Sequence, residues 1–483
     1  MTVSIPGYDS TNRVPGFYFA LDNSRANTAA ASRRVLIIGQ RITGTPGASG
    51  QAVQATGISS AVSQYGDGSQ IAMMLAAYRQ LDPAGEVWLL PLDDAAGSTP
   101  ASAQIAISGQ AATSGVLSVM VNDMTISVPV QVGDNAATVA TSIATRLGQT
   151  AGLPVTSKAD GATVTLTARN SGAVDNQHVA VIGTSGVSGV TCQVGAFSGG
   201  NQNPQLASIL PSLGGRSYDL IMHPYADAAS LAAFRDWTDN TSGRWSPMIQ
   251  LYGQGITAVK LGYGQATAYP LKNDPHQTVI PTSDSPSHPA LWAAWIGARA
   301  AVSMRDNPAL PISGLTIPAL PPSSAGEFDR QQRNSLLHDG FSTYTVSDDG
   351  TVSIERLITT YTTNSYGLPD NSYLDLERLL TAQVCLEDMR IFLSTQCGRS
   401  ILLQNGSRIP AGARAVTPNM IAAAIKGRYR TQCDNLWCQD PDGFAAELVV
   451  ENQGEGVVKA LLPYRFADQL WVIAGNAQFL AAS

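Results

Sequence analysis

Short apolar segments alternate with amphipathic segments along the first two thirds of the chain, and this alternation restricts the fold more than any other pattern. RVLIIGQ (34–40) and EVWLLPL (86–92) are typical of buried strands, whereas SQIAMMLAAYRQL (69–81), which lies between them, has apolar side chains at helical spacing. The same strand pattern recurs in YDLIMHPY (218–225) and PMIQLYG (247–253), and further helices are predicted for residues 204–213, 228–240 and 288–304. Strands that alternate with helices predict a parallel, doubly wound α/β sheet.

A segment of different composition, residues 96–202, interrupts this alternation. Its only aromatic residue is Phe197. Two alternating runs meet at Asn122-Asp123, which is a hairpin signal, and NAATVATSIATRL (135–147) has the spacing of an amphipathic helix. The sequence therefore predicts a β-rich domain inserted into an α/β domain that comprises residues 34–95 and 203–325.

A proline-rich segment, residues 308–324, is the predicted connector to a C-terminal α+β domain, residues 326–483. Helices are predicted there for residues 328–340, 373–396 and 417–435, and a hairpin is predicted around the Asp-Gly turn of SDDG (347–350). The predicted strands near the end of the chain are GFAAELVVENQ (443–453), VVKALLPY (457–464) and LWVIAGNAQFL (470–480).

The N-terminal arm and tether, residues 1–33, contain an aromatic strand that the α/β core does not need. In Val14–Leu21 the side chains of Phe17, Phe19 and Leu21 fall on one face and Tyr18 falls on the other. The twelve polar or small residues 22–33 can span roughly 40 Å when extended. An exposed strand on such a tether is a pairing hazard unless it is donated to another sheet, so we expect it to join a neighbouring chain.

Composition excludes several functional classes. Charged residues make up 13% of the chain, its net charge is −7 and its pI is near 5.2, which argues against nucleic-acid binding. The five cysteines show no disulfide or metal-site spacing and indicate folding in a reducing compartment. We see no secretory signal and no run of 18 apolar residues, so no membrane insertion is expected.

Catalytic and ligand-binding motifs are not evident, and we predict no catalytic residue, metal or cofactor. The loop GQRITGTPGASG (39–50) follows a predicted strand but lacks dinucleotide-binding spacing, so a plain loop is favoured over a phosphate site. Cys433 and Cys438 lack the further ligands that zinc needs, and DPDG (440–443) is better explained as a turn than as a calcium loop. His223, at a predicted strand end, has no matched nucleophile.

Three basic residues lie close together in this acidic chain, within IKGRYR (425–430). Lys426, Arg428 and Arg430 form either a solvated helix face or an electrostatic contact with an acidic partner surface.

The order of the segments resembles that of the tail sheath proteins of contractile bacteriophages, most closely the Mu-like type. VPGFYFA and the tether precede RVLIIGQ, and YGDGSQIAMMLAAYRQLDPAGEVWLLPL and VGDNAATVATSIATRL follow. The last third contributes VSIERLITTYTTNSYGLPDNSYLDLERLLT, AVTPNMIAAAIKGRY and the ending LPYRFADQLWVIAGNAQF. The resemblance covers nearly the whole chain.

This resemblance implies a structural subunit and not an enzyme. Such sheaths are hexameric rings stacked helically around a tail tube, and they contract to drive the tube through the host envelope during genome delivery. It implies a tail tube protein, baseplate and tail terminator proteins as partners, a place in the virion and assembly in the host cytoplasm. It also implies a subtilisin-like α/β domain, an innermost C-terminal domain and an outward insertion.

The resemblance further implies that terminal arms of one subunit complete a sheet in the C-terminal domains of its neighbours. The arm residues would be Val14, Phe17, Tyr18, Phe19, Leu21, Leu470, Trp471, Val472, Ile473 and Phe479, and the tube contact would be Lys426, Arg428 and Arg430. The alternatives are an α/β hydrolase or nucleotide-binding enzyme, a host-binding tail adhesin suggested by the β-rich insertion, and a tube protein, which the α/β core disfavours.

Overall fold

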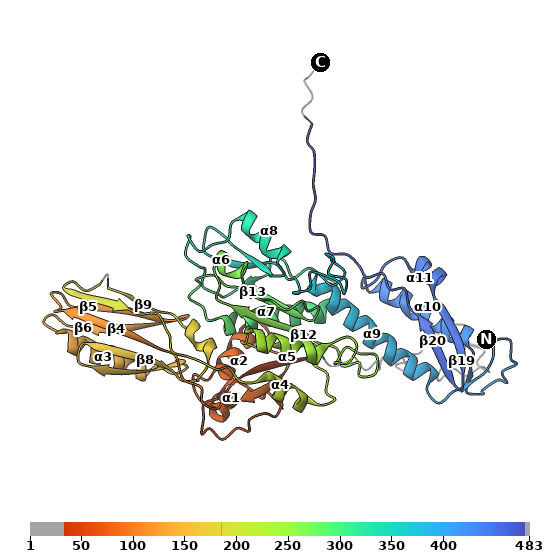
Figure 1. Cartoon of the computed structure of the whole chain (residues 1–483), viewed down its shortest axis with the longest axis horizontal. Coiled ribbons are helices and arrows are strands. Elements are labelled where there is room, and N and C mark those ends of the chain that lie inside the picture. The colour runs from red at the N-terminus through yellow and green to blue at the C-terminus, as the bar shows by residue number, and fades with distance from the viewer. Residues whose placement is uncertain (1–32, 185, 479–483) are drawn as a thin grey trace, which may run out of the picture. The chain divides into compact units, whose positions relative to one another are not determined.

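The structure is a computed structural model that describes residues 33–184 and 186–478. A six-stranded sheet lies at the centre of the α/β domain (Figure 1). From edge to edge its strands are β13 (Gln277–Pro281), β12 (Gln254–Val259), β11 (Leu220–Met222), β1 (Arg34–Gln40), β3 (Glu86–Leu92) and β2 (Val53–Gln54). All neighbours pair in parallel except β2 with β3, and the strand order extends in both directions from β1.

Helices cover both faces of this sheet. Successive side chains of a strand point to opposite sides, so its apolar side chains lie on both faces and both must be buried. Val35 and Ile37 of β1 pack in one cluster with α2 (Gln70–Leu81) and α7 (Pro289–Asp306), whereas Leu36 and Ile38 pack with helices on the other face. The remaining helices of this domain are α1 (Ile58–Tyr65), α4 (Leu206–Ile209), η2 (Leu210–Leu213), α5 (Ala228–Thr238) and α6 (Tyr263–Ala266). The predicted parallel α/β sheet is therefore present.

Two predicted strands are wrong, the first entirely and the second in part. Residues 247–253 form a turn-rich loop, in which the N–H groups of Ile249 and Gln250 both donate to the Ser246 carbonyl, and β12 begins only at Gln254. Residues 443–453 begin in the helix α11 (Pro441–Glu447), because the Asp440 side chain accepts from the Gly443 N–H and caps that helix. Only Val449–Gly454 of that segment forms a strand.

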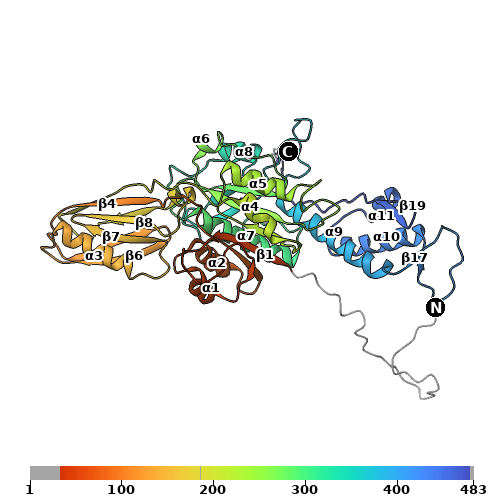
Figure 2. The ribbon, with the colours of Figure 1, turned by 60° about the horizontal axis from the view of Figure 1, so that its bottom comes forward.

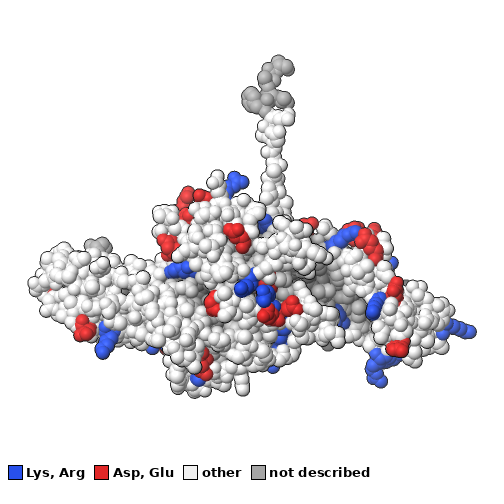
Figure 3. All heavy atoms as spheres, in the orientation of Figure 1, with Lys and Arg blue, Asp and Glu red and all other residues white. Residues whose placement is uncertain are grey.

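The insertion has its own core, built from two antiparallel sheets and one helix (Figure 2). Its sheets are β10 (Val190–Val194), β4 (Ser102–Gly109), β8 (Thr163–Ala168) and β7 (Val155–Asp160), and β6 (Met124–Val130), β5 (Gly115–Val121) and β9 (Ala180–Gly183). The predicted hairpin at Asn122-Asp123 is confirmed by the pairing of Val121 with Met124, and the predicted helix is α3 (Ala136–Gly148). On the face shown in Figure 3, charged side chains are sparse over this domain.

The two ends of the insertion leave the α/β domain side by side. The Thr99 N–H donates to Asn201 Oδ1 at 2.9 Å, and Ser102 pairs with Ser198. One internal segment, the short helix η1 (Ala173–Gln177), contacts the α/β domain through Val174, which is buried in the cluster of Leu36. The insertion is thus joined to the α/β domain through its ends, through η1 and through further hydrogen bonds, such as those from the Gly152 N–H to Asp67 at 2.8 Å and from the Ser287 hydroxyl to Asp123.

We expect a chain in which residues 97–202 are replaced by a short Gly/Ser linker to fold, because the two ends are close. Loss of the Val174 contact alone should lower the free energy of unfolding by about 1.5–3 kcal/mol, the value of one buried aliphatic side chain, and loss of the hydrogen bonds across the same junction should lower it further. Urea unfolding followed by circular dichroism measures this, with Val174→Ala in the intact chain as the matched control. Aggregation of every linker variant, together with an excised insertion that does not fold, would contradict the expectation.

The C-terminal third contributes to two cores. A three-stranded sheet of β14 (Thr316–Ile317), β16 (Val352–Arg356) and β15 (Thr343–Val346) packs with α8 (Arg330–His338) on the main core. The helix α9 (Leu376–Cys397) joins this core through Leu376, Leu380 and Val384, and its later residues Cys385 and Met389 belong to a separate cluster. The main core thus continues across the predicted boundary at residues 325/326, and the domain boundaries stay predictions.

The separate cluster joins the end of α9 to α10 (Pro418–Asp434), α11 and a two-stranded sheet. Thr417 caps α10 by accepting from the Met420 N–H at 3.4 Å. Tyr429 and Phe444 stack with their ring centroids 3.7 Å apart at the centre of this cluster. The nearby strands are β17 (Ile401–Leu402), β18 (Ala415–Val416), β19 (Val449–Gly454) and β20 (Val457–Leu461). Among the described residues, no helix combines the length and the apolar composition needed to span a membrane.

Candidate assembly interface

The hairpin β19–β20 is a sheet with two open edges. Each of its strands pairs only with the other among the described residues. Val449 lies opposite Leu461, and these two side chains and Val457 are 44%, 64% and 49% exposed. Apolar side chains beside unpaired backbone N–H and C=O groups form a template for further strands. The sequence predicts strands here but does not single out these three residues. The signal for them was the pair of apolar segments on either side of Gly454.

The segment that ends the described chain is apolar and largely without contacts. Leu470, Val472 and Ile473 are exposed, at 71%, 78% and 83%. The Arg356 guanidinium lies 4.7 Å from the Trp471 ring centroid, and Asp468 pairs with Arg378 at 2.7 Å just before this segment. The predicted strand over residues 470–480 is not formed within the chain, at least as far as residue 478. A run of apolar residues without a partner strand among the described residues leaves these side chains available for another sheet.

The remaining predicted arm residues lie outside the part of the chain that the structure describes. They are Val14, Phe17, Tyr18, Phe19, Leu21 and Phe479. Their donation to a neighbour stays a prediction.

The three basic residues of α10 do not share one face. The Arg428 Nε lies 2.7 Å from Asp388 Oδ2 of α9, and this hydrogen bond raises the pKa of the guanidinium. Lys426 and Arg430 are four residues apart and therefore lie on a common face of the helix. The Arg430 side chain is 64% exposed and lies 3.7 Å from Asp442, which is itself almost fully exposed. Arg428 is thus occupied within the chain, and only Lys426 and Arg430 remain available for the predicted tube contact.

Reversal of both available charges, Lys426→Glu with Arg430→Glu, should leave stability unchanged, because surface ion pairs contribute little. We expect this variant to bind a tail tube more weakly, and the difference should shrink at high salt because salt screens exposed charges. Co-sedimentation with purified tube measures the effect, and the exposed pair Arg408→Glu with Arg414→Glu controls for net charge. Equal co-sedimentation of both double variants would refute the contact.

The crevice in which an α/β enzyme binds its ligand is filled in this chain. That crevice lies at the carboxyl ends of the parallel strands. At the end of β1 the Gln40 side chain donates to Asp94 Oδ1 and to the Ser171 carbonyl, both at 2.7 Å. Asn170 adds a bond to the Arg41 carbonyl at 2.8 Å. Segments at the base of the insertion thus occupy the position that an enzyme leaves open.

His223, which follows β11, is also unsuited to catalysis. Its ring is fully buried, and its Nε2 lies 3.2 Å from Gln277 Oε1. Burial lowers the pKa of His223 to about 4, so the ring stays neutral near pH 7 and has no contact with solvent.

A buried group of ionisable residues joins the insertion to α7 and has the residue types of a metal site. Possible ligand atoms of Asp175, His178 and His288 lie within 4.8 Å of one another. However, the Asn122 side-chain amide donates to His178 Nδ1 at 3.0 Å, and the Ala290 N–H donates to His288 Nδ1 at 3.2 Å. A neutral imidazole that accepts at Nδ1 carries its proton on Nε2, which then cannot bind a metal. The group is therefore better explained as a hydrogen-bonded junction.

Comparison with known proteins agrees with this absence of an open catalytic crevice. Residues 199–360 match the family model described as phage tail sheath protein central domain. The Mu-like prophage FluMu tail sheath protein of Haemophilus influenzae is 29% identical over 489 residues, which cover 99% of this chain and 100% of that protein. The chain is thus similar to a phage tail sheath protein over its whole length, and its residues 199–360 match the central domain of that family.

Solved structures with the same fold include sheath proteins. The crystal structure of the sheath tail protein Lin1278 from Listeria innocua has a TM-score of 0.50 at 14% identity, and covers 92% of this chain and 94% of that one. The sheath complex of the extracellular contractile injection system PVC, in its contracted state, has a TM-score of 0.50 at 10% identity, with 98% and 99% covered. At such low identity these structures show the fold alone.

These similarities support a structural role for the chain, as a subunit of a contractile tail sheath. The matched family and the Haemophilus relative are structural proteins, which confirms the prediction that the chain is not an enzyme. The alternative of a hydrolase or nucleotide-binding enzyme is thereby set aside.

Proposed function

We propose that this chain is a tail sheath protein that polymerises as hexameric rings stacked helically around a tail tube, and that contraction of the stack drives the tube through the host envelope. The observation that carries the proposal is the hairpin β19–β20, whose two edges are unpaired among the described residues, together with the exposed apolar segment 470–478. Strand addition at an open edge supplies main-chain hydrogen bonds for affinity and side-chain contacts for specificity.

The hairpin offers one edge for each predicted arm. Each chain has two predicted arms, residues 14–21 and 470–480, and the hairpin has two edges. In a lattice of identical subunits every donated strand needs one acceptor edge, so a single hairpin could receive both arms. Links made through extended arms also allow rigid bodies to rotate against each other while the links persist, which contraction requires.

The proposal includes the finer predictions made from the sequence. The α/β domain would be of the subtilisin-like type, the C-terminal domain would face the tube, and the insertion would face outward. The partners would be a tail tube protein, a baseplate and a tail terminator, and assembly would take place in the host cytoplasm before incorporation into the virion.

Electron microscopy of the purified full chain tests the proposal. We expect striated tubes with six-fold symmetry in cross-section. A protein that stays monomeric at high concentration, both with and without tail tubes, would refute it.

A further inference from the structure

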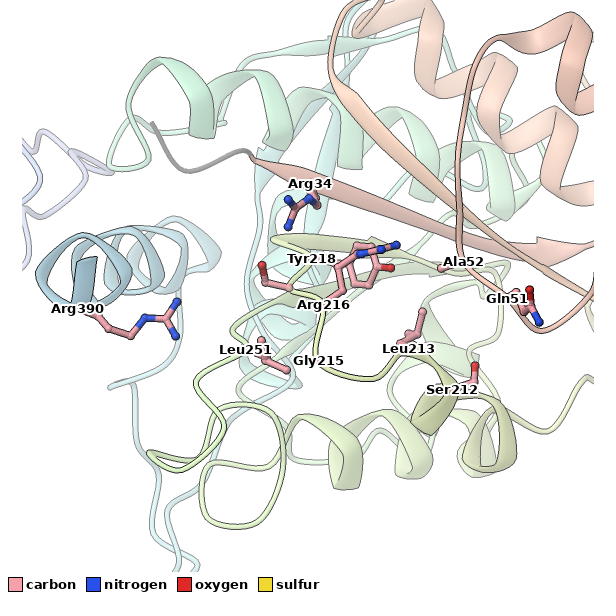
Figure 4. A pocket seen from close by; sticks show the side chains of 11 residues that line it. Arg34, Gln51, Ala52, Ser212, Leu213, Gly215, Arg216, Tyr218, Leu251 and Arg390 are labelled. Carbon is pink, nitrogen blue, oxygen red and sulfur yellow. The ribbon is translucent and has the colours of Figure 1, made fainter. Parts of the chain in front are cut away.

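A basic pocket lies at the amino ends of the parallel strands β1, β11 and β12, at the opposite edge of the sheet from the filled crevice (Figure 4). Its volume is about 790 Å³ and it opens widely to solvent. Arg34 reaches it from the start of β1, Arg216 from the loop before β11 and Arg390 from α9. The pocket therefore gathers three guanidinium groups from distant parts of a chain whose net charge is −7.

Two of these guanidinium groups have no carboxylate partner among the described residues. Arg34 is paired with Glu86 at 3.0 Å, whereas the exposed Arg216 lies over the Trp88 ring, 3.9 Å from its centroid. The Arg390 Nη1 donates only to the Gln250 carbonyl, at 3.4 Å. A guanidinium that lies over an aromatic ring keeps its edge N–H groups available to accept a planar anion.

A fourth arginine fixes the loop that forms the pocket wall. Arg244 is 4% exposed, and its guanidinium donates to the carbonyls of Gly214 at 3.2 Å, Arg216 at 2.5 Å and Leu251 at 3.2 Å. Burial lowers the pKa of Arg244 to about 10, so it remains a cation at neutral pH. Its partners are carbonyl oxygens, so its positive charge is not neutralised and adds to the potential of the pocket.

We propose that this pocket binds an acidic turn of a second copy of the chain, Asp348-Asp349 between β15 and β16. The proposal rests on the proposed function, because a homopolymer places other copies of the chain next to every pocket. Arginine forks match carboxylates in paired hydrogen bonds, and a wide, open pocket suits a protruding turn better than a small molecule.

The turn has the properties that such a ligand needs. Asp348 and Asp349 are exposed, adjacent at the tip of a hairpin, and form no ion pair among the described residues. Some other exposed carboxylates are used within the chain, for example Asp93 by Arg41, and others without an ion pair, such as Asp160 and Asp306, are not adjacent to a second carboxylate. Hydrogen bonds from Thr351 hold Asp349 and lower its pKa, so it is ionised at neutral pH. A pocket on one copy that binds a turn on the next is a heterologous contact, which generates open helical assemblies.

The first test measures binding without relying on tube formation. A fluorescent peptide of residues 343–356 is titrated with the full chain, held below its assembly concentration, and anisotropy is recorded at low salt. We expect replacement of both aspartates by asparagine, or Arg216→Glu with Arg390→Glu in the protein, to weaken binding at least 10-fold. Arg408→Glu with Arg414→Glu, the matched control, should change it less than 2-fold. Equal binding of the acidic and amidated peptides would overturn the proposal, whether or not the wild type forms tubes.

The second test is a charge exchange in the assembling protein. Arg216→Glu with Arg390→Glu, and separately Asp348→Arg with Asp349→Arg, should each raise the concentration needed for tubes at least 10-fold. The chain that carries all four changes should return to within about 3-fold of the wild type, because close charge pairs across interfaces couple strongly. Thermal unfolding confirms that each variant is folded. Failure of the fourfold variant to recover, when the wild type forms tubes, would overturn the assignment of the turn as the ligand.

Discussion

Deletion of residues 1–21 should yield a folded, soluble sheath protein that no longer forms tubes. The described residues from Val35 onward form extensive core clusters of their own, so we expect the chain to fold without the deleted arm. Each backbone hydrogen bond that the arm adds to a neighbour's sheet contributes about 0.5–1.5 kcal/mol. Burial of Phe17 and Phe19 contributes roughly 1.5–3 kcal/mol each, and ordering the arm offsets part of this sum. Analytical ultracentrifugation with electron microscopy measures the loss.

Two point substitutions in the predicted arm distinguish backbone pairing with a neighbour's sheet from side-chain contact alone. Tyr18→Pro removes a backbone donor inside the predicted strand and should reproduce the deletion. Gly16→Ala, at the edge of the same strand, keeps its donor and should assemble almost normally. Tubes of normal stability from the truncated chain would show that the arm is not the link between subunits.

Removal of one buried carboxylate, by Asp82→Asn, should lower the free energy of unfolding by about 3 kcal/mol. Asp82 is 2% exposed at the end of α2, and its two oxygens accept from Arg305 of α7 at 2.7 and 3.0 Å. Tyr78 and the Gly85 N–H donate to the same carboxylate. The variant leaves the Arg305 guanidinium facing a neutral amide. Urea unfolding monitors the change, with the exposed Asp236→Asn as the matched control near zero.

The same carboxylate gives a defined pH dependence. Burial alone would raise the pKa of Asp82, but the hydrogen bonds from Arg305 and Tyr78 and the charge of Arg305 outweigh it and lower the pKa. A depressed folded-state pKa stabilises the fold above the unfolded value of about 3.9 and loses this effect as the pH falls below it. The stability difference between wild type and Asp82→Asn should therefore be constant from pH 7 to pH 5 and shrink toward pH 3. A difference that stays constant down to pH 3 would refute this assignment.

The sequence predicts elements well where apolar spacing alone determines burial. β1, α2, β3 and α7 follow this rule, because their core positions are apolar. β13 was not predicted, since its strand begins with Gln277 and Thr278, and polar residues ordinarily indicate exposure. In the structure Gln277 is buried against His223, a partner 54 positions away in the chain, so no local pattern reveals it.

The candidate sites also differ in how well the sequence predicts them. The N-terminal arm can be predicted from sequence because its signal, aromatic alternation beside a polar tether, lies within one short segment, and it stays a prediction. The basic pocket is not, because Arg34, Arg216 and Arg390 are separated by more than 150 residues and only the parallel sheet and α9 bring them together. The internal pairing of Arg428 with Asp388 was equally invisible, since a contact between two helices decides which charges of α10 remain available.

The closed stem of the insertion has a consequence for how the chain folds as it is synthesised. β1 pairs with β11 in a register that joins Val35 to Leu220, so the centre of the sheet must wait until the insertion has been made. The entropic cost of closing a loop grows with the logarithm of its length, and a tenfold shorter loop costs roughly 2 kcal/mol less. Because the insertion has a core of its own and ties Thr99 to Asn201, its early folding converts more than a hundred intervening residues into a short connection. The nascent β11 then emerges close to β1, and the time during which the apolar edges of β1 and β3 are exposed to other nascent chains is reduced.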